Sequence, residues 1–238
     1  MSAPTRFVNG VTTGAVNTNL GMFPLPDPTE AVVCFNDFNQ YVAGDWTVTN
    51  TTSHATIGLV AASSTIPAGG VIGLVGGASS ANTDVAAIIA NPANFYFAAG
   101  TPVWFYCHLN AATAANDLII AGLTSANATA AVTNGIYFSK SAGSANVDFV
   151  VKKTTATTQT TVATMTDGGN IELGFYYNGK DGIDVFVNEV KVYQQTTLTY
   201  LPTAVALAPG VAMKLSATSP TTAALYSDFI LAAQGRSF

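Results

Sequence analysis

The stretch from Ile171 to Tyr193 (IELGFYYNGKDGIDVFVNEVKVY) constrains the fold most, because apolar and polar side chains alternate along it with a period of two. Alternation of this kind, interrupted by clusters of Asn, Gly and Asp, is typical of half-buried β-strands joined by tight turns. We therefore predict three antiparallel strands. A five-residue loop over 178–182 joins the first two, and a two-residue turn at Asn188 and Glu189 joins the last two.

The register of these strands follows from the rule that side chains facing each other across a ladder lie on one face of the sheet. Four pairs meet this condition: Phe175 with Val185, Leu173 with Val187, Val187 with Val190, and Val185 with Val192. This register places the aliphatic residues on one face, and we expect that face to pack on a core while the other is wetted. Glu189 is less usual in such a turn, because a type I′ turn prefers Gly after Asn.

Further strands are expected along the rest of the chain, at intervals near the 8–12 residues typical of a sandwich or barrel. They are predicted over 31–38, 46–49, 54–61, 71–75, 103–109, 117–123, 135–139, 147–152, 160–165, 211–215 and 225–231. The segment 85–90 is ambiguous, because Asp84 could cap a short helix although Pro92 leaves it little length. Strand 103–109 has Val103, Phe105, Cys107 and Leu109 on one face, and Trp104, Tyr106 and His108 on the other.

The chain divides into an N-terminal arm over residues 1–30 and a single β-sandwich domain over residues 31–238. The arm lacks periodicity, and its Pro-containing stretch before residue 30 should run extended. It also carries Phe7, Phe23 and Leu25, which are too apolar for a solvated tail. Either the arm packs along its own domain, or it reaches a neighbouring subunit.

The composition favours a protein that packs among neighbours. Only 9% of the 238 residues are charged, against a typical ~25%, so the polar surface must come from Thr, Ser, Asn and Gln. Such a surface repels other proteins weakly. A neutral β protein with Ala- and Thr-rich loops would have the same composition, and this alternative stays open.

The charge and hydropathy patterns also bear on partners and location. The eight Lys and Arg residues are scattered and the net charge is −5, so we expect no nucleic-acid partner. No apolar run of ~18 residues is free of helix breakers, so we expect no transmembrane helix and no membrane partner. No secretory signal is visible, and we expect the protein to stay in the cytoplasm where it is made. Cys34 and Cys107 are therefore expected to be reduced.

Three pieces of the chain resemble the concanavalin A-like, or laminin G-like, jelly roll. They are FNDF at 35–38 with the downstream Trp46, GIYFSK at 135–140 followed by VDF at 147–149, and the stretch Glu172–Tyr193, whose FVNEVKV is similar to the hairpin of that family. The closing YSDFI at 226–230 resembles the last strand of the family, which pairs beside the first. The resemblance covers residues 31–233 and implies an all-β jelly-roll sandwich with an extended N-terminal arm.

Members of this fold include glycosidases, which carry acidic residues alternating on one strand, and this chain has no such run. Its nearest pair, Glu172 and Asp184, would lie about 13 Å apart in the register above. A retaining pair needs ~5.5 Å and an inverting pair up to ~9.5 Å. We therefore expect no catalytic residues and no enzyme, with both carboxylates solvated at the surface.

Metal and cofactor sites find little support either. Cys107 and His108 are adjacent, so their side chains point to opposite faces and cannot share a zinc ion. Calcium could use Asp167, Asp181 or Asp184, but turn chemistry alone explains the sequence NGKDG. No nucleotide-binding motif occurs. We expect neither a metal nor a cofactor.

Aromatic side chains on the faces opposite the predicted core need a separate explanation. Trp104 and Tyr106 lie on one such face, and Tyr176 and Phe186 lie on another. A lectin would stack such rings on sugar, whereas in a two-sheet fold loops or a neighbouring subunit can cover the larger sheet. Phe186 also faces Gly174, where a ring can cover the bare glycine. We favour packing or subunit contact over sugar binding.

The low charge, the Ala- and Thr-rich sequence and the Pro-containing arm resemble structural proteins of tailed bacteriophage particles, especially capsid decoration or cement proteins. That resemblance implies a location on the capsid surface, the major capsid protein as partner, and a homotrimer. The candidate subunit or capsid contacts are Phe7, Phe23, Leu25, Trp104 and Tyr106. A carbohydrate-binding or receptor-binding module of a virion is the alternative, and a glycoside hydrolase is a third.

Overall fold

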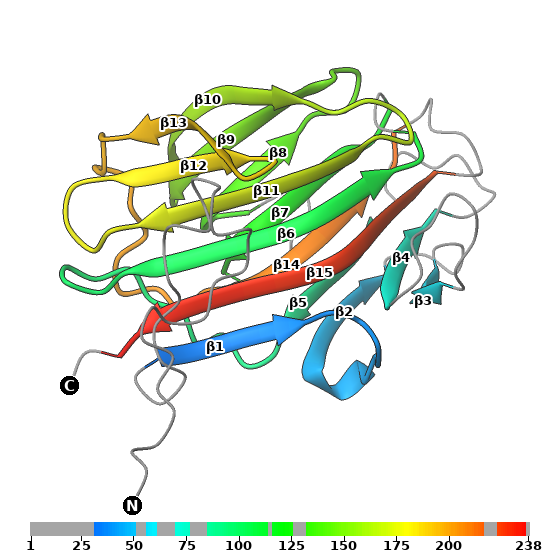
Figure 1. Cartoon of the computed structure of the whole chain (residues 1–238), viewed down its shortest axis with the longest axis horizontal. Coiled ribbons are helices and arrows are strands. Elements are labelled where there is room, and N and C mark those ends of the chain that lie inside the picture. The colour runs from blue at the N-terminus through cyan, green and yellow to red at the C-terminus, as the bar shows by residue number, and fades with distance from the viewer. Residues whose placement is uncertain are drawn as a thin grey trace, which may run out of the picture.

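The computed structural model describes residues 31–50, 56–60, 70–76, 85–113, 116–125, 132–216 and 223–236, which form two antiparallel β-sheets packed face to face (Figure 1). The sheet toward the viewer, called the front sheet below, has eight strands. Seven of them follow the order β13 (Val190–Gln195), β12 (Ile183–Val187), β11 (Asn170–Tyr177), β6 (Val103–Ala111), β15 (Ala224–Gly235), β4 (Val71–Val75) and β3 (Thr56–Val60). The eighth, β1 (Ala31–Asn36), pairs with β15 as well.

The sheet behind it, called the back sheet, has seven strands. Its order is β10 (Ala156–Thr164), β9 (Asn146–Lys153), β8 (Asn134–Lys140), β7 (Leu118–Thr124), β14 (Ala208–Lys214), β5 (Val85–Ala90) and β2 (Trp46–Asn50). A 3-10 turn over Ala43–Asp45 precedes β2. The segment 85–90 that the sequence left ambiguous is a strand, and it is buried along nearly its whole length. The predicted all-β jelly-roll sandwich is confirmed.

The core lies between the two sheets and is filled by the inward rows of alternating strands. Phe175 and Phe105 of the front sheet stack with ring centroids 5.5 Å apart. Phe149 of the back sheet meets Phe175 at 5.8 Å, edge to face. Each ring contributes about 1.5–3 kcal/mol by leaving water. The predicted division of strand 103–109 is confirmed, because Phe105, Cys107 and their neighbours on that row belong to this core.

The register predicted for the first hairpin is confirmed, with Phe175 opposite Val185 and Leu173 opposite Val187. In the second hairpin Val187 does lie opposite Val190. The prediction that Val185 faces Val192 is wrong, because a β-bulge lets Tyr193 take that position.

The expectation that Val190 and Val192 face the core is also wrong. Both are exposed, Val190 to 55%. The reason is their place on β13, the end strand of the front sheet. Burial falls toward the hairpin tip, since Val185 is fully buried and Val187 only partly. The predicted pairing of Val187 with Val190 is therefore correct, but the core does not extend as far as β13.

Both predicted turns are present, and local chemistry explains each. In the loop 178–182 the side-chain Oδ1 of Asn178 accepts hydrogen bonds from the backbone N–H groups of Lys180, Asp181 and Gly182, at 2.9, 3.1 and 3.2 Å. In the second turn Asn188 and Glu189 have φ values of +49° and +65°. The turn therefore has the two positive φ angles of type I′, and Glu189 holds a conformation that Gly adopts more easily.

The last two strands of the chain lie in the middle of the sandwich. In the front sheet β15 pairs with β6 on one side and with β1 and β4 on the other. In the back sheet β14 lies between β7 and β5. The pairing of the last strand beside the first, which the family resemblance implied, is confirmed by the β1–β15 ladder.

The two cysteines are free, and the sheet keeps them apart. Cys34 lies opposite Ala232 and Cys107 lies opposite Ile230, on the two strands that flank β15. Their Cα atoms are therefore about 12 Å apart, from two strand spacings and an offset of two residues. A disulfide requires less than ~7 Å, so the fold does not allow these two to be bridged within one chain.

Candidate functional site

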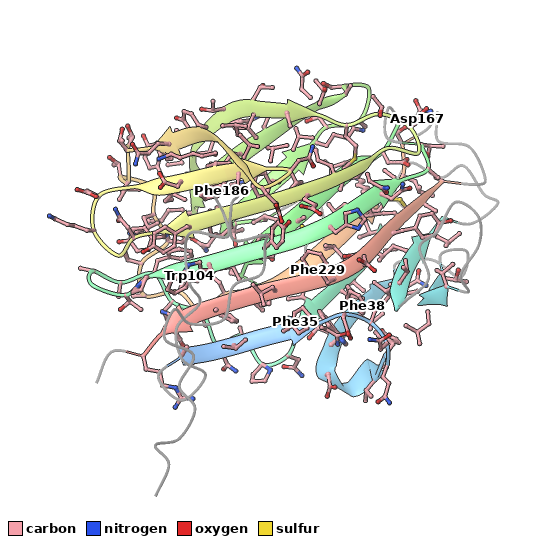
Figure 2. All side chains as sticks on the ribbon, viewed as in Figure 1. Phe35, Phe38, Trp104, Asp167, Phe186 and Phe229 are labelled. Atoms are coloured by element: carbon pink, nitrogen blue, oxygen red, sulfur yellow. The ribbon has the colours of Figure 1, made fainter. Side chains whose placement is uncertain are left out.

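The outer face of the front sheet carries a group of aromatic side chains, which we call the outer aromatic cluster. It consists of Trp104 and Tyr106 of β6, Tyr176 of β11, Phe186 of β12, and Phe229, Leu231 and Ala233 of β15. Figure 2 labels Trp104, Phe186 and Phe229, which come from three strands of the sheet that faces the viewer. The cluster forms because polar positions of the predicted alternation hold rings on several adjacent strands.

The rings of the cluster pack on one another along the sheet. Trp104 lies 5.1 Å from Tyr176, centroid to centroid, and Tyr106 lies 5.0 Å from Phe229. Such pairs add about 0.5–1.5 kcal/mol beyond the burial of their area. Phe186 lies opposite Gly174, as the sequence predicts.

The cluster is buried, which contradicts the expectation of a wetted outer face. Phe186 is 0% exposed and Trp104 is 8% exposed, although no described strand packs over this face of the sheet. The indole N–H of Trp104 is buried and has no acceptor among the described residues. A buried donor without an acceptor costs free energy, so an acceptor that packs against this nitrogen would stabilise the protein.

A shallow hollow of about 370 Å³ adjoins the cluster on the same face. Its lining is mostly polar: His108, Asn170, Ile171, Glu172, Asn188 and Glu189. Three neighbouring elements place these groups together, namely β6, β11 and the turn between β12 and β13. Asn188 lies beside Glu172, since the backbone N–H of Glu172 donates to Asn188 Oδ1 at 2.9 Å.

Tyr106 joins the cluster to the hollow. Its hydroxyl group donates to the Glu172 carboxylate. Burial raises the pKa of Tyr106, and the bond to Glu172 raises it further. The phenol therefore stays a neutral donor at ordinary pH. On the other side, His108 Nδ1 lies 3.9 Å from Asp228 Oδ2, close enough for an ion pair when the imidazole is protonated.

The hollow thus presents carboxylate and amide oxygens beside an aromatic surface. Glu172 and Glu189 supply acceptors, and Asn188 and Asn170 supply both donors and acceptors. This arrangement can bind groups that carry several hydroxyl donors. It offers no pair of carboxylates on neighbouring positions of one strand.

The pair considered for catalysis is not brought together. Tyr176 lies opposite Asp184, and Glu172 is four residues from Tyr176 along β11. The separation along the ladder is therefore about 13 Å, as predicted from the sequence. Asp184 also forms an ion pair with Lys191 at 2.6 Å and accepts a hydrogen bond from Gln194 at 2.9 Å. The sequence analysis expected a solvated Asp184 carboxylate, and the structure instead gives it two side-chain partners.

Groups of three or more metal-ligating side chains do not occur in the part of the chain that the structure describes. Of the three residues considered for calcium, Asp181 accepts a hydrogen bond from the Asn178 side chain at 2.8 Å within its own loop. Asp184 is held by Lys191 on the neighbouring strand. The described residues also include no helix long and apolar enough to span a membrane.

The residues predicted as subunit or capsid contacts are placed as follows. Trp104 and Tyr106 lie together on the outer face of β6, as predicted, and both are buried there. Phe7, Phe23 and Leu25 lie outside the described residues. The assignment of all five as contacts stays a prediction.

One exposed surface escaped the sequence reasoning, and we call it the apolar edge. It gathers five of the eight large apolar side chains that are exposed in the described ranges: Val33, Phe35, Val42, Val48 and Leu59. They come from β1, β2, β3 and the connection before β2, which lie together at the bottom and lower right of Figure 1. The signal was visible in AVVCF at 31–35, where apolar residues occupy both faces of the strand.

The sequence analysis also did not identify a buried lysine. Lys140 ends β8 and is 1% exposed, and its ammonium group donates to the backbone carbonyl of Asp117. Burial lowers the pKa of Lys140, while the nearby carboxylates of Asp117 and Asp167 act in the opposite direction. Its burial and its bond to a backbone carbonyl suit a structural role.

Comparison with known proteins establishes the fold. No family model matches the chain, and no curated protein is similar to it in sequence. An endo-1,3-beta-glucanase from Streptomyces sioyaensis aligns over 89% of this chain and 99% of its own, with 10% identity and a TM-score of 0.62. Arcelin-5, a lectin-like defence protein from Phaseolus vulgaris, aligns over 87% and 100%, with 11% identity and a TM-score of 0.58.

A protein of unknown function from Shewanella oneidensis aligns over 87% of this chain and 90% of its own, with 15% identity and a TM-score of 0.59. The chain has a concanavalin A-like jelly-roll fold. Glucanases and lectin-like proteins share it, and identities this low establish the fold alone.

Proposed function

We propose that this protein is a non-enzymatic structural component of a bacteriophage particle, a capsid decoration protein that bridges capsomers. It is made in the host cytoplasm and attaches to the major capsid protein as an oligomer, which the family resemblance suggests is a trimer. The apolar edge is the observation that carries the proposal, because it gathers most of the large apolar side chains that are exposed in the described ranges, on β1, β2, β3 and the connection before β2.

The apolar edge has the chemistry of an interface. Phe35 is 58% exposed on β1, a size and exposure that a monomer in water rarely combines with further exposed valines nearby. Among the described strands β1 pairs with β15 alone, so its other edge offers backbone N–H and C=O groups to a partner strand.

Charge does not protect this edge. Edge strands commonly carry Lys to prevent association, yet residues 31–60 contain no Lys or Arg. The acidic residues there are Asp37 and Asp45, both in the connection between β1 and β2. A protein that works alone would be expected to block such an edge, whereas a subunit of a shell uses it.

The outer faces of both sheets support the same proposal. A second buried cluster lies on the outer face of the back sheet and includes Tyr137, Ile120 and Val150. Apolar side chains on inner and outer faces make a stiff, thick plate rather than an open binding cleft. A plate that buries surface at capsomer junctions would oppose expansion of the shell by adding interface that expansion must break.

The proposal can be tested on particles. Particles released from the host that carries this sequence would be purified by density gradient, and peptides of this chain quantified against the major capsid protein by mass spectrometry. We expect a fixed ratio near a simple fraction. Absence of the chain from particles that contain their other structural proteins would contradict the proposal.

The role of the apolar edge has its own test. Phe35→Glu should shift the light-scattering mass of the purified protein toward the monomer and weaken binding to emptied heads. Val190→Glu is the matched control, because Val190 is similarly exposed but lies on the opposite edge strand. Equal effects of the two substitutions, or a wild-type monomer that fails to bind heads, would argue against the assigned interface.

Carbohydrate binding is the second candidate, and the polar hollow favours it. Glu172, Asn188 and Glu189 present oxygen acceptors beside Tyr106, a combination suited to sugar hydroxyl groups. A glycan array would show binding that Glu172→Gln abolishes if this candidate is correct. Turnover of a polysaccharide, lost in the same variant, would instead restore the glycoside hydrolase interpretation.

A further inference from the structure

We propose that the N-terminal segment of this chain, residues 1–30, covers the outer aromatic cluster of its own subunit. This inference rests on the geometry of the front sheet and does not depend on the proposed role in a virion.

Burial of the cluster requires a cover. A single layer of side chains on the outer face of a sheet keeps one side toward water unless something packs on it. Phe186 and Tyr106 are 0% and 3% exposed, and the described strands form two layers with no third layer over this face. The cover must therefore come from the rest of the chain or from a partner.

The amino-acid sequence indicates which part of the chain can serve. The internal segments outside the description are at most nine residues long, and the longest, 61–69, has Ile66 as its one large apolar residue. The N-terminal segment is far longer and richer in such residues. Its large apolar residues are Met1, Phe7, Val8, Val11, Val16, Leu20, Met22, Phe23 and Leu25.

The attachment point of the segment lies close to the cluster. Ala31 begins β1 opposite Gly235, and two residues earlier on β15 Ala233 lies opposite Trp104. Two strand spacings and two residues place Ala31 about 12 Å from Trp104. Thirty extended residues reach ~100 Å, so the segment can cross the face. Because the attachment point is this close, the effective concentration of the segment is higher at the cluster of its own subunit than at that of a second copy.

The chemistry of the nearest part of the segment fits the cluster. Residues 23–28 read FPLPDP, which favours the extended polyproline conformation. That conformation leaves its carbonyl groups without internal hydrogen bonds and docks on surfaces lined by aromatic rings. Trp104 and Tyr176 provide such a surface, and the unpartnered indole N–H of Trp104 provides the donor that a free carbonyl would accept.

Tryptophan fluorescence of the full chain tests the proposal. The protein has two tryptophans, and Trp46 is buried in the core between the sheets. The signal of Trp104 is therefore obtained by subtracting the spectrum of a Trp104→Phe variant. In the double variant Phe23→Ser, Leu25→Ser we expect red-shifted Trp104 emission and stronger quenching by acrylamide. Leu59→Ser is the control and should leave the Trp104 signal unchanged, because Leu59 is exposed on β3 and lies opposite Ile72, on the face away from the cluster.

An unchanged Trp104 signal in a double variant with wild-type far-UV circular dichroism would overturn the proposal. Cross-linking gives a second measurement that needs no destabilising change. Benzoylphenylalanine in place of Phe23, activated by light in dilute full-length protein, should form bonds within one chain to peptides that contain Trp104, Tyr176 or Phe229. Bonds between chains would assign the cover to a second copy, and bonds to other regions would place the segment elsewhere; either result refutes the proposal.

Discussion

Phe186 offers the sharpest test of the fold, because the sequence and the structure disagree on its surroundings. It lies on β12 with its ring on the outer face of the front sheet, yet it is 0% exposed. Phe175 on the neighbouring β11 is equally buried but faces the core. The two form a matched pair: the same residue type, adjacent strands, opposite faces.

The expected cost of Phe186→Ala follows from its burial. A buried ring removes about 200 Å² from water, and at about 25 cal/mol per Å² this gives about 5 kcal/mol. Measured Phe→Ala changes in cores range from about 3 to 5 kcal/mol. We expect Phe186→Ala to lower the free energy of unfolding by that amount, close to the loss from Phe175→Ala.

Urea unfolding followed by circular dichroism would measure both variants, with equal slopes confirming that the same surface is exposed. If the outer face were wetted, Phe186→Ala would cost about 1 kcal/mol or less. A loss that small beside a loss above about 3 kcal/mol for Phe175→Ala would refute the covered outer face. The result would also remove the main support for a cover formed by residues 1–30.

Three further predictions concern the core, a turn and the thiols. Val185→Asp should prevent folding, because it buries a charge without a partner, whereas Asp184→Ala should cost only about 1 kcal/mol through its lost ion pair; equal losses in thermal unfolding would show the faces to be misassigned. Glu189→Gly should raise the free energy of unfolding by about 0.5–1 kcal/mol, since Gly adopts φ of +65° without strain, and a lower midpoint in urea would contradict this. Burial raises the pKa of Cys34 from 9.0 to about 11, so its thiolate fraction at pH 8, and its labelling rate, should be about 100-fold below that of an ordinary thiol. Cys107 should react only on unfolding, two thiols should be counted in denatured protein, and fast labelling of the native protein would refute the assigned burial.

The sequence was most informative where one face of a strand meets the core. Strict alternation located β11 and β12 and paired Phe175 with Val185 correctly. It could not foresee the bulge on β13, because one extra residue leaves the pattern of apolar residues unchanged while it moves Val192 away from Val185. Nor could it foresee that Val190 is exposed, since the depth of a core depends on the position of a strand in its sheet.

The outer aromatic cluster marks a different limit. Periodicity assigns Trp104 and Phe186 to the face opposite the core, and that assignment is confirmed. Whether such a face is wet depends on what lies over it, which no local pattern contains. One signal did exist, because VWFYC at 103–107 is a continuous apolar run of the kind found in strands buried on both faces.

The hollow beside the cluster was out of reach for a related reason. Glu172 and Asn188 could be placed opposite each other from the hairpin register. His108 joins them only because β6 pairs with β11, a contact between residues more than sixty positions apart. The apolar edge depends in the same way on how β1, β2 and β3 meet across two sheets.

The central positions of β14 and β15 have a consequence for how the molecule comes into being. Without β15 no described strand joins β6 to β1 and β4, and without β14 none joins β7 to β5, so each sheet falls into separate pieces. A ribosome that has made the first two hundred residues has therefore produced strands whose edges are still open. Both sheets close only when residues near 235 emerge, so folding must wait until β15 has been made, and pairings this distant in sequence form slowly. Until then the chain depends on dilution or on chaperones to keep its open edges from pairing with those of other nascent copies.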